Sequence, residues 1–230
     1  MKILFTLSCA MALFTATHAA AETRADMLKM QISELAHANM ERTDNWPEVR
    51  QQLDGLIAEL TREAGAATPE DVIEFGGGSW QQVWSDESNP EPPGFARVWP
   101  QIFQVVTPFG YGYNFGVRKA PWGDDITFIL RVKVGVDGTK ALAEITDAFS
   151  RPGRLQPGED LYSLALAIEA GTAPGVEKRE SGRFPNGPIG AKGEFETLFV
   201  DHSLKVGIAP NSYSGKPELF VMERKAGPQE

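Results

Sequence analysis

Histidine, serine and acidic side chains could support hydrolytic or metal chemistry, but their spacing in this chain does not favour it. His37 and His202 are the only histidines after residue 21, and neither has a second ligand at the spacing of a metal motif. Asp201 and Ser203 flank His202, yet neighbours along an extended strand point away from one another, and no G-x-S-x-G elbow presents a nucleophile. We therefore expect no metal site and no catalytic triad.

Two other patterns could bind a cofactor or carry out acid–base chemistry. Residues 110–116 alternate glycine with tyrosine, asparagine and phenylalanine, but the spacing is not that of a dinucleotide loop and no helix follows. We therefore expect no cofactor. Glu194 and Glu196 would share one strand face. They could act as a carboxylate pair, or they could belong to an ordinary strand edge that faces solvent.

Aromatic side chains at every second position give a stronger pattern. Trp80 and Trp84 would share one strand face, and Tyr111, Tyr113 and Phe115 would share another. Such faces fill the core of a small barrel, and at its mouth they can also line a cavity for one small hydrophobic ligand. The pattern is compatible with both.

The elements that would position these side chains change type along the chain. Residues 23–64 predict two helices, the first capped by Thr23 with Asp26 and the second opened by Pro47 and ended by Gly65. The apolar residues of the second helix recur at helical spacing, which predicts that this helix packs onto a core. Residues 68–71 predict one further short helical turn before three consecutive glycines at 76–78.

From residue 78 onward the apolar period is that of strands. An Asp137-Gly138 hairpin signal follows the longest alternating run. About eight short strands joined by turns predict an antiparallel barrel or sandwich. The expected strands are 79–85, 97–107, 111–117, 126–136, 140–149, 193–200, 203–208 and 218–225. Residues 159–170 fit either a helix or a strand, and residues 172–192 predict a long surface loop.

The first 21 residues predict a cleaved export signal, with Lys2 before an apolar stretch and small residues at 19–21. Cys9, the single cysteine, lies in this segment, so disulfides are not expected in the exported protein. The formal net charge of −9 disfavours nucleic acid as a partner, and no later segment is long and apolar enough to span a membrane. We expect a periplasmic or secreted protein, whose oligomeric state the sequence leaves open.

Two segments resemble the plastid-lipid-associated protein (PAP)/fibrillin family. Residues 78–85 resemble its G-x-W-x-x-x-Y-[ST] first strand, with Trp84 in place of the tyrosine. Residues 197–206 resemble its T-x-L-D-x-x-L-R-I segment, with Lys205 in place of the arginine, and residues 218–224 resemble its closing L-F-V-L-x-R strand. A second arginine of the family is replaced by Ile208.

The resemblance implies a mainly β fold: an antiparallel lipocalin-like β-barrel at residues 67–230, preceded by helices at 22–66. It also implies that the protein binds or carries a small hydrophobic molecule of the lipid or isoprenoid class, with no catalytic residue. The candidate ligand-binding residues are Trp84, Tyr111, Tyr113, Phe115, Arg131 and Lys205. Two alternatives remain. One is an enzyme that acts on a hydrophobic substrate inside the barrel, by isomerase or epoxide chemistry, through a buried carboxyl for which Glu144 and Glu196 are the candidates. The other is a protein-interaction domain that uses the N-terminal helices.

Overall fold

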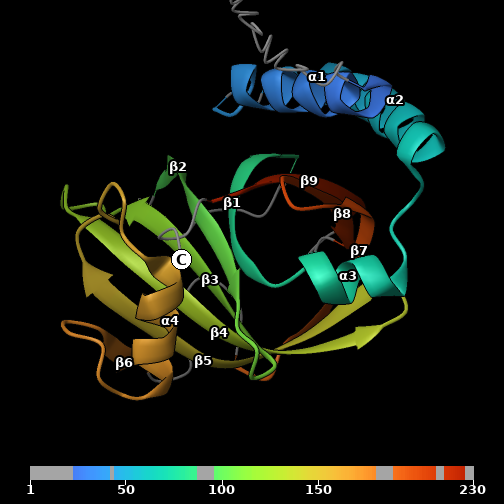
Figure 1. Ribbon diagram of the computed structural model, residues 1–230. Helices are drawn as coiled ribbons and strands as arrows, with labels where there is room; N and C mark the ends of the chain where they lie inside the picture. Colours follow the sequence, from blue (N-terminus) through green and yellow to red (C-terminus); the bar gives the residue numbers. More distant parts are fainter. Residues whose placement is uncertain (1–22, 42–43, 87–95, 180–188, 211–214, 226–230) are drawn as a thin grey trace, which may run out of the picture.

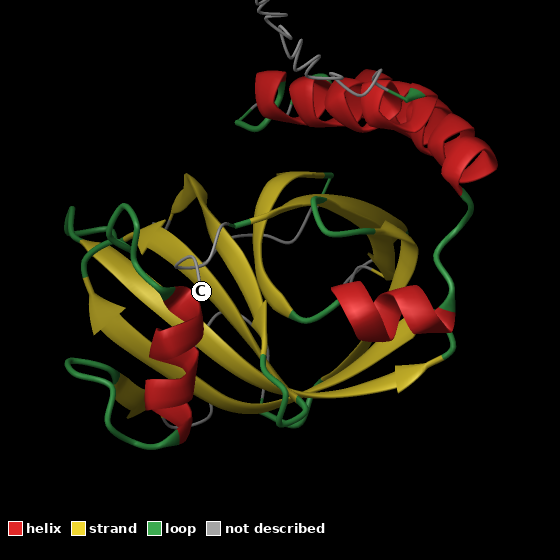
Figure 2. Ribbon diagram, in the orientation of Figure 1, coloured by secondary structure: helices red, strands yellow, loops and turns green. Residues whose placement is uncertain are grey.

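The computed structural model describes residues 23–41, 44–86, 96–179, 189–210 and 215–225, and the predicted export signal lies outside them. Two long helices precede a sheet of short and long strands, and two shorter helices lie against that sheet (Figures 1 and 2). Among the described residues, no helix is long and apolar enough to cross a membrane.

The N-terminal helices form a hairpin whose ends follow local capping chemistry. Helix α1 (Arg24–Ala38) begins at Thr23, whose hydroxyl accepts from the backbone N–H of Asp26 while the Asp26 carboxylate accepts from the backbone of Thr23. Helix α2 (Trp46–Ala64) has proline in its first turn and stops at Gly65, whose φ of +94° few other residues adopt. Both predicted helices are confirmed.

Antiparallel strands make up most of the remaining chain. Their order in the sheet is β4-β3-β2-β1-β9-β8-β7-β5, and β5 also pairs with β4, so these eight strands form a ring. The strands are β1 (Gly78–Ser85), β2 (Ala96–Val106), β3 (Tyr111–Lys119), β4 (Asp125–Asp137), β5 (Lys140–Pro152), β7 (Lys192–Val200), β8 (Leu204–Pro210) and β9 (Pro217–Arg224). The predicted mainly antiparallel β class with N-terminal helices is confirmed.

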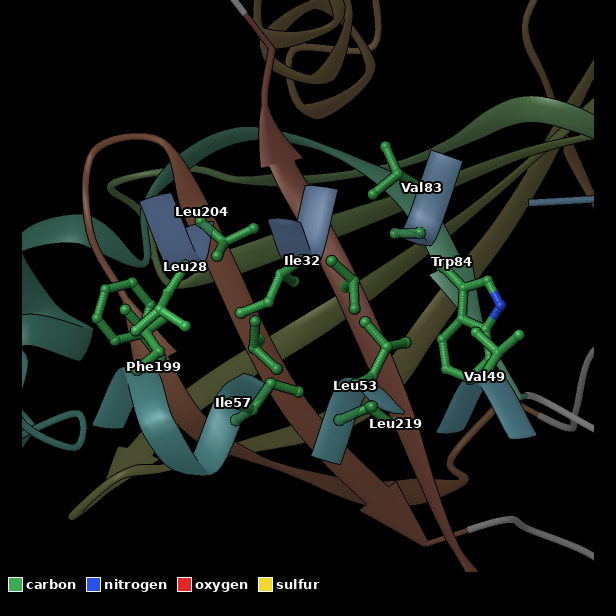
Figure 3. Packing of buried hydrophobic residues seen from close by; sticks show 14 residues of the cluster. Leu28, Ile32, Val49, Leu53, Ile57, Val83, Trp84, Phe199, Leu204 and Leu219 are labelled. Carbon is green, nitrogen blue, oxygen red and sulfur yellow. The ribbon is translucent and has the colours of Figure 1, made fainter. Parts of the chain in front are cut away.

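The hairpin covers the outer face of β1, β8 and β9. Its apolar stripe, including Leu28, Ile32 and Leu53, is fully buried against Val206 and Val221 of the sheet. Figure 3 shows these helix side chains pointing at the strands, where they meet apolar side chains of the sheet. The stripe thus packs on the protein's own sheet, as its spacing predicts.

Helix α4 (Leu161–Glu169) covers a second part of the outer face and resolves the ambiguity at residues 159–170 as a helix. Asp160 caps it by accepting from the backbone N–H groups of Tyr162 and Ser163. Its buried side chains pack on β2, β3 and β4 in a cluster that includes Leu161, Leu164, Ile168, Phe103, Tyr113, Phe115 and Ile129.

Helix α3 (Pro69–Phe75) lies across the opening of the ring, where it contacts both β4 and β7 (Figure 1). Thr68 and Asp71 form its capping box, which confirms the predicted turn. Val72 of α3 packs with Trp80, Val200 and Met222. Val72 thus joins the short helix to the inner side of the ring.

The loop predicted at residues 172–192 needs correction in its first part. Residues Glu177–Arg179 form a short strand, β6, which pairs with β5 at Ala148, Phe149 and Ser150. Three residues of mixed charge carry no apolar alternation, so the pattern could not reveal them. Residues 180–188 of the loop lie outside the described part of the chain.

Candidate functional site

The inner side of the ring encloses a cavity of about 1020 Å³. Ligand pockets for small organic molecules commonly have volumes of about 300–1,000 Å³, so this cavity could hold one such molecule. Its walls are chiefly apolar and come from several strands and from α3. They include Ile73, Ile102, Val106, Phe128, Leu130, Val132, Val134, Ala143, Ile145, Phe195, Phe220 and Met222.

Glycines on β3 help to keep this space open. Gly112 and Gly116 line the cavity, and a Cβ on Gly112 would lie 3.0 Å from Val132 Cγ2. The alternating residues of the same strand, Tyr111 and Tyr113, pack beneath α4 instead. In the alternation at residues 110–116, glycine therefore takes the cavity side and the tyrosines take the outer side.

The tyrosines were predicted to face a ligand, and the structure places them elsewhere. Tyr111 and Tyr113 are not among the lining residues, because the apolar face of α4 needs large partners on the outer side of β3. The Tyr113 hydroxyl donates to the Glu169 carboxylate over 3.1 Å, and burial raises the pKa of this tyrosine to about 12. Phe115 belongs to the same cluster but also borders the cavity.

Trp80 and Trp84 do not share a strand face, so the prediction from simple alternation was wrong for this pair. The register between β1 and β9 shifts between Gln82 and Trp84, so one extra residue, Val83, is accommodated there. Trp80 packs with Val72, Val200 and Met222. Val83 and Trp84 both pack under the helical hairpin (Figure 3). Trp84 is therefore part of the outer core and does not line the cavity.

Arg131 also lies outside the cavity lining. Its Nε donates to Asp147 Oδ2 over 2.9 Å, and its guanidinium lies 5.0 Å from the Tyr111 ring centroid. Burial alone would raise the pKa of Asp147, but hydrogen bonds from Lys178 and Arg131 outweigh it and hold that pKa below its ordinary value. Arg131 thus belongs to an ion-pair network on the outer side.

Lys205 is the predicted site residue that the structure places inside. Its side chain lines the cavity and is only 6% exposed. The ammonium Nζ donates to Gln104 Oε1 over 2.5 Å and lies 5.2 Å from the Phe195 ring centroid and 5.6 Å from that of Trp80. Burial, followed by repulsion from Arg224, lowers the pKa of Lys205 to about 7.

Arg224 fixes the end of the ring next to Lys205. Its guanidinium stacks 3.9 Å from the Trp80 ring centroid and donates to the backbone carbonyls of Phe75 and Gly77. Gly78 allows this approach, because it has a φ of +86° and a Cβ there would lie 2.4 Å from Arg224 Nη1. The arginine thereby joins α3 to β1 and β9, and burial lowers its pKa.

The carboxyl residues proposed for catalysis lie away from the cavity lining. Glu144 is 46% exposed and forms an ion pair with Lys192 at 3.7 Å, and Glu196 is not among the lining residues. Glu194 does line the cavity, and it pairs with Lys140 at 3.2 Å. No group of three or more metal-ligating side chains occurs within the described ranges.

Gln104, Phe195 and Arg224 are the residues around Lys205 that sequence reasoning missed. Gln104 Nε2 also lies 3.5 Å from Asn114 Oδ1, so a short row of polar groups crosses β2 and β3 inside the ring. Strand alternation places Gln104 and Asn114 on the same face of paired strands, but only the three-dimensional closure brings Lys205 to them.

No protein-family model and no curated protein matches this chain.

Proposed function

We propose that this protein is an exported, lipocalin-like β-barrel protein that binds or carries one small hydrophobic molecule of the lipid or isoprenoid class. The cavity inside the strand ring carries the proposal, because its volume and apolar walls suit such a ligand. The resemblance of residues 78–85 and 197–206 to the PAP/fibrillin family supports the same class. Export to the periplasm or the medium is part of this proposal and rests on residues 1–21.

Burial of the ligand against the apolar walls would supply the binding free energy. Each square ångström of apolar surface removed from water contributes about 25 cal/mol. The glycine side of β3 matters for the same reason, because larger side chains at Gly112 or Gly116 would occupy the space of the ligand. Among the described residues, the lining carboxylate Glu194 is paired with Lys140, and Glu144 and Glu196 do not line the cavity. A binding function is therefore the one that the geometry favours.

Two neighbouring positions on β5 allow a matched test. Ala143 lines the cavity, whereas Leu142 is 43% exposed and is absent from the lining. A tryptophan at either position adds a similar volume, but only Ala143→Trp places that volume inside the ring. Titration with the neutral fluorescent probe N-phenyl-1-naphthylamine should show saturable binding, weakened at least about tenfold by Ala143→Trp and unchanged by Leu142→Trp.

Circular dichroism melting of both variants establishes that they fold. Equal probe affinity in Ala143→Trp and the unaltered protein would place binding outside the cavity and contradict the proposal. Mass spectrometry of organic extracts from protein made in its native host should also reveal one enriched hydrophobic molecule. Absence of such a molecule together with absence of probe binding would overturn the proposed function.

A further inference from the structure

The charged side chains around the cavity differ in sign from the chain as a whole. The chain has a formal net charge of −9, yet the ionisable lining residues within the described ranges include two arginines and two lysines but one carboxylate, Glu194. That carboxylate pairs with Lys140 outside the lining, and Lys192 at the edge pairs with Glu144. The charged side chains that line the cavity are thus mostly cationic.

Lys205 is the most deeply placed of these cations. In the described part of the chain, its hydrogen-bond acceptor is the neutral Gln104 amide, and the other groups that contact Nζ are the rings of Trp80 and Phe195. An ammonium has three donors, so a further acceptor can be accommodated. Moving a cation from water into apolar surroundings without a counter-ion is costly, and a bound anion would offset that cost.

Arg224, which stacks on Trp80, adds positive potential near Lys205, but its own hydrogen-bond donors are largely engaged. Its Nη1 and Nη2 donate to the carbonyls of Gly77 and Phe75, and it is not among the lining residues. The anion would therefore accept from one ammonium, next to the Gln104 amide, and one ammonium matches a single negative charge.

We propose that the ligand of this cavity is an apolar molecule that ends in a carboxylate, and that Lys205, flanked by Gln104, binds this carboxylate. The inference rests on the proposed function and specifies its ligand class. The apolar tail would lie along the wall formed by Phe128, Leu130 and Val132. A charge-assisted hydrogen bond between the ammonium and the carboxylate would fix the orientation of the ligand.

Proton linkage follows from this arrangement. The groups that face Lys205 are Arg224 from β9, which lowers its pKa, and the neutral Gln104, Trp80 and Phe195 from β2, β1 and β7. The other charged groups of the cavity lining are Arg97, Arg118, Lys192 and Glu194. A bound carboxylate would raise the pKa of Lys205 above its free value, so binding above neutral pH takes up a proton. Affinity for a carboxylate should therefore decline as the pH rises from about 7 to 9.

The experiment uses the full protein and compares ligands that differ only in the headgroup. Tetradecanoate, tetradecanol and tetradecyl phosphate each displace bound N-phenyl-1-naphthylamine at pH 7. We expect tetradecanoate to bind at least about tenfold tighter than tetradecanol, because hydrogen bonds to charged groups contribute more than neutral ones. Lys205→Met should abolish this preference and leave the affinity for tetradecanol intact.

Lys133→Met serves as the matched control, because Lys133 is an exposed lysine on β4 that does not line the cavity. It should leave all three affinities unchanged. Calorimetry of the unaltered protein in two buffers of different ionisation enthalpy at pH 8 should show proton uptake with tetradecanoate and none with tetradecanol. This measurement does not depend on whether the Lys205 variant folds.

The outcomes separate the two proposals. Failure of the probe and of all three ligands to bind would overturn the proposed function. Binding with equal affinity for tetradecanoate and tetradecanol, or a preference that survives Lys205→Met, would leave the proposed function standing and overturn the carboxylate inference. Tighter binding of tetradecyl phosphate than of tetradecanoate would also overturn it, in favour of a phosphate headgroup.

Discussion

The outer face beneath the helical hairpin and the inner face of the ring use the same strands for different purposes. Strand β8 shows the contrast, because its successive residues point alternately to the outer core under the helices and to the interior of the ring. Its outward side chains pack under α1 and α2, whereas Lys205 and Ala209 line the cavity and Gly207 lies beneath the Phe195 ring. The outward residues are Leu204, Val206 and Ile208.

The difference shows where stability and binding each reside. Large apolar side chains from helices and strands fill the outer face and are almost fully buried there. The inner face combines apolar walls with glycines and an ammonium that lacks a carboxylate partner among the described residues. We infer that the outer face holds the ring closed, which allows the inner face to remain unfilled.

The largest expected effect comes from truncating a side chain of the outer core. Leu53 of α2 is fully buried, so Leu53→Ala should lower the free energy of unfolding by about 3 kcal/mol. Leu130 lines the cavity, so Leu130→Ala should lower it by less than about 1 kcal/mol. Urea denaturation measures both, and equal losses would break the proposed division between the two faces.

The next effect concerns a close contact within the ring. A Cβ on Gly207 would lie 2.3 Å from Phe195 Cε1 and 2.5 Å from the carbonyl oxygen of Glu196. Gly207→Ala should therefore lower the free energy of unfolding by about 1–3 kcal/mol. Gly135→Ala is the control, because nothing lies within 4 Å of that Cβ. Similar melting temperatures for both variants would show that the Phe195–Gly207 contact is not needed.

A third prediction concerns the pH dependence of stability. The pKa of Lys205 is about 7 in the folded protein and near its ordinary 10.5 when unfolded. Between these values the unfolded chain binds more protons, so this lysine should make stability rise with pH by up to about 1.4 kcal/mol per unit. Below pH 7 its destabilising effect is constant. Denaturation of the unaltered protein and Lys205→Met from pH 6 to 9 should show the gain from substitution shrinking as pH rises.

The smallest expected effect lies at the opening of the ring. Thr68→Ala removes the hydroxyl that accepts from the backbone N–H of Asp71, which should cost about 1 kcal/mol. Because α3 borders the cavity, amide hydrogen exchange should accelerate in Pro69–Phe75 and remain unchanged in Trp46–Ala64. Acceleration in both helices would show that the opening and the outer core unfold together.

Much of the fold could be predicted from local pattern, because capping and alternation are short-range properties. Thr23, Thr68 and Gly65 mark helix ends in the sequence and in the structure. The faces of the strands were harder to assign. Alternation shows that Tyr113 and Gly112 point in opposite directions, but the position of α4 decides which direction is outward.

The candidate site could be predicted only in part for the same reason. An extra residue in β1 moves Trp84 to the outer face, and strict alternation contains no signal for such a bulge. Lys205 was found through its place in the resemblance to the PAP/fibrillin family. Its partners Gln104 and Phe195 lie on other strands, and they meet it only when the ring closes.

Methyl NMR spectra during titration with N-phenyl-1-naphthylamine test the account most directly, because both faces carry leucine and valine. We predict saturable shifts for the methyl groups of Leu130, Val132 and Val134, which line the cavity, and none for those of Leu53 and Val206 in the outer core. Shifts confined to the outer-core methyl groups, or the absence of saturable shifts, would contradict a ligand site inside the ring.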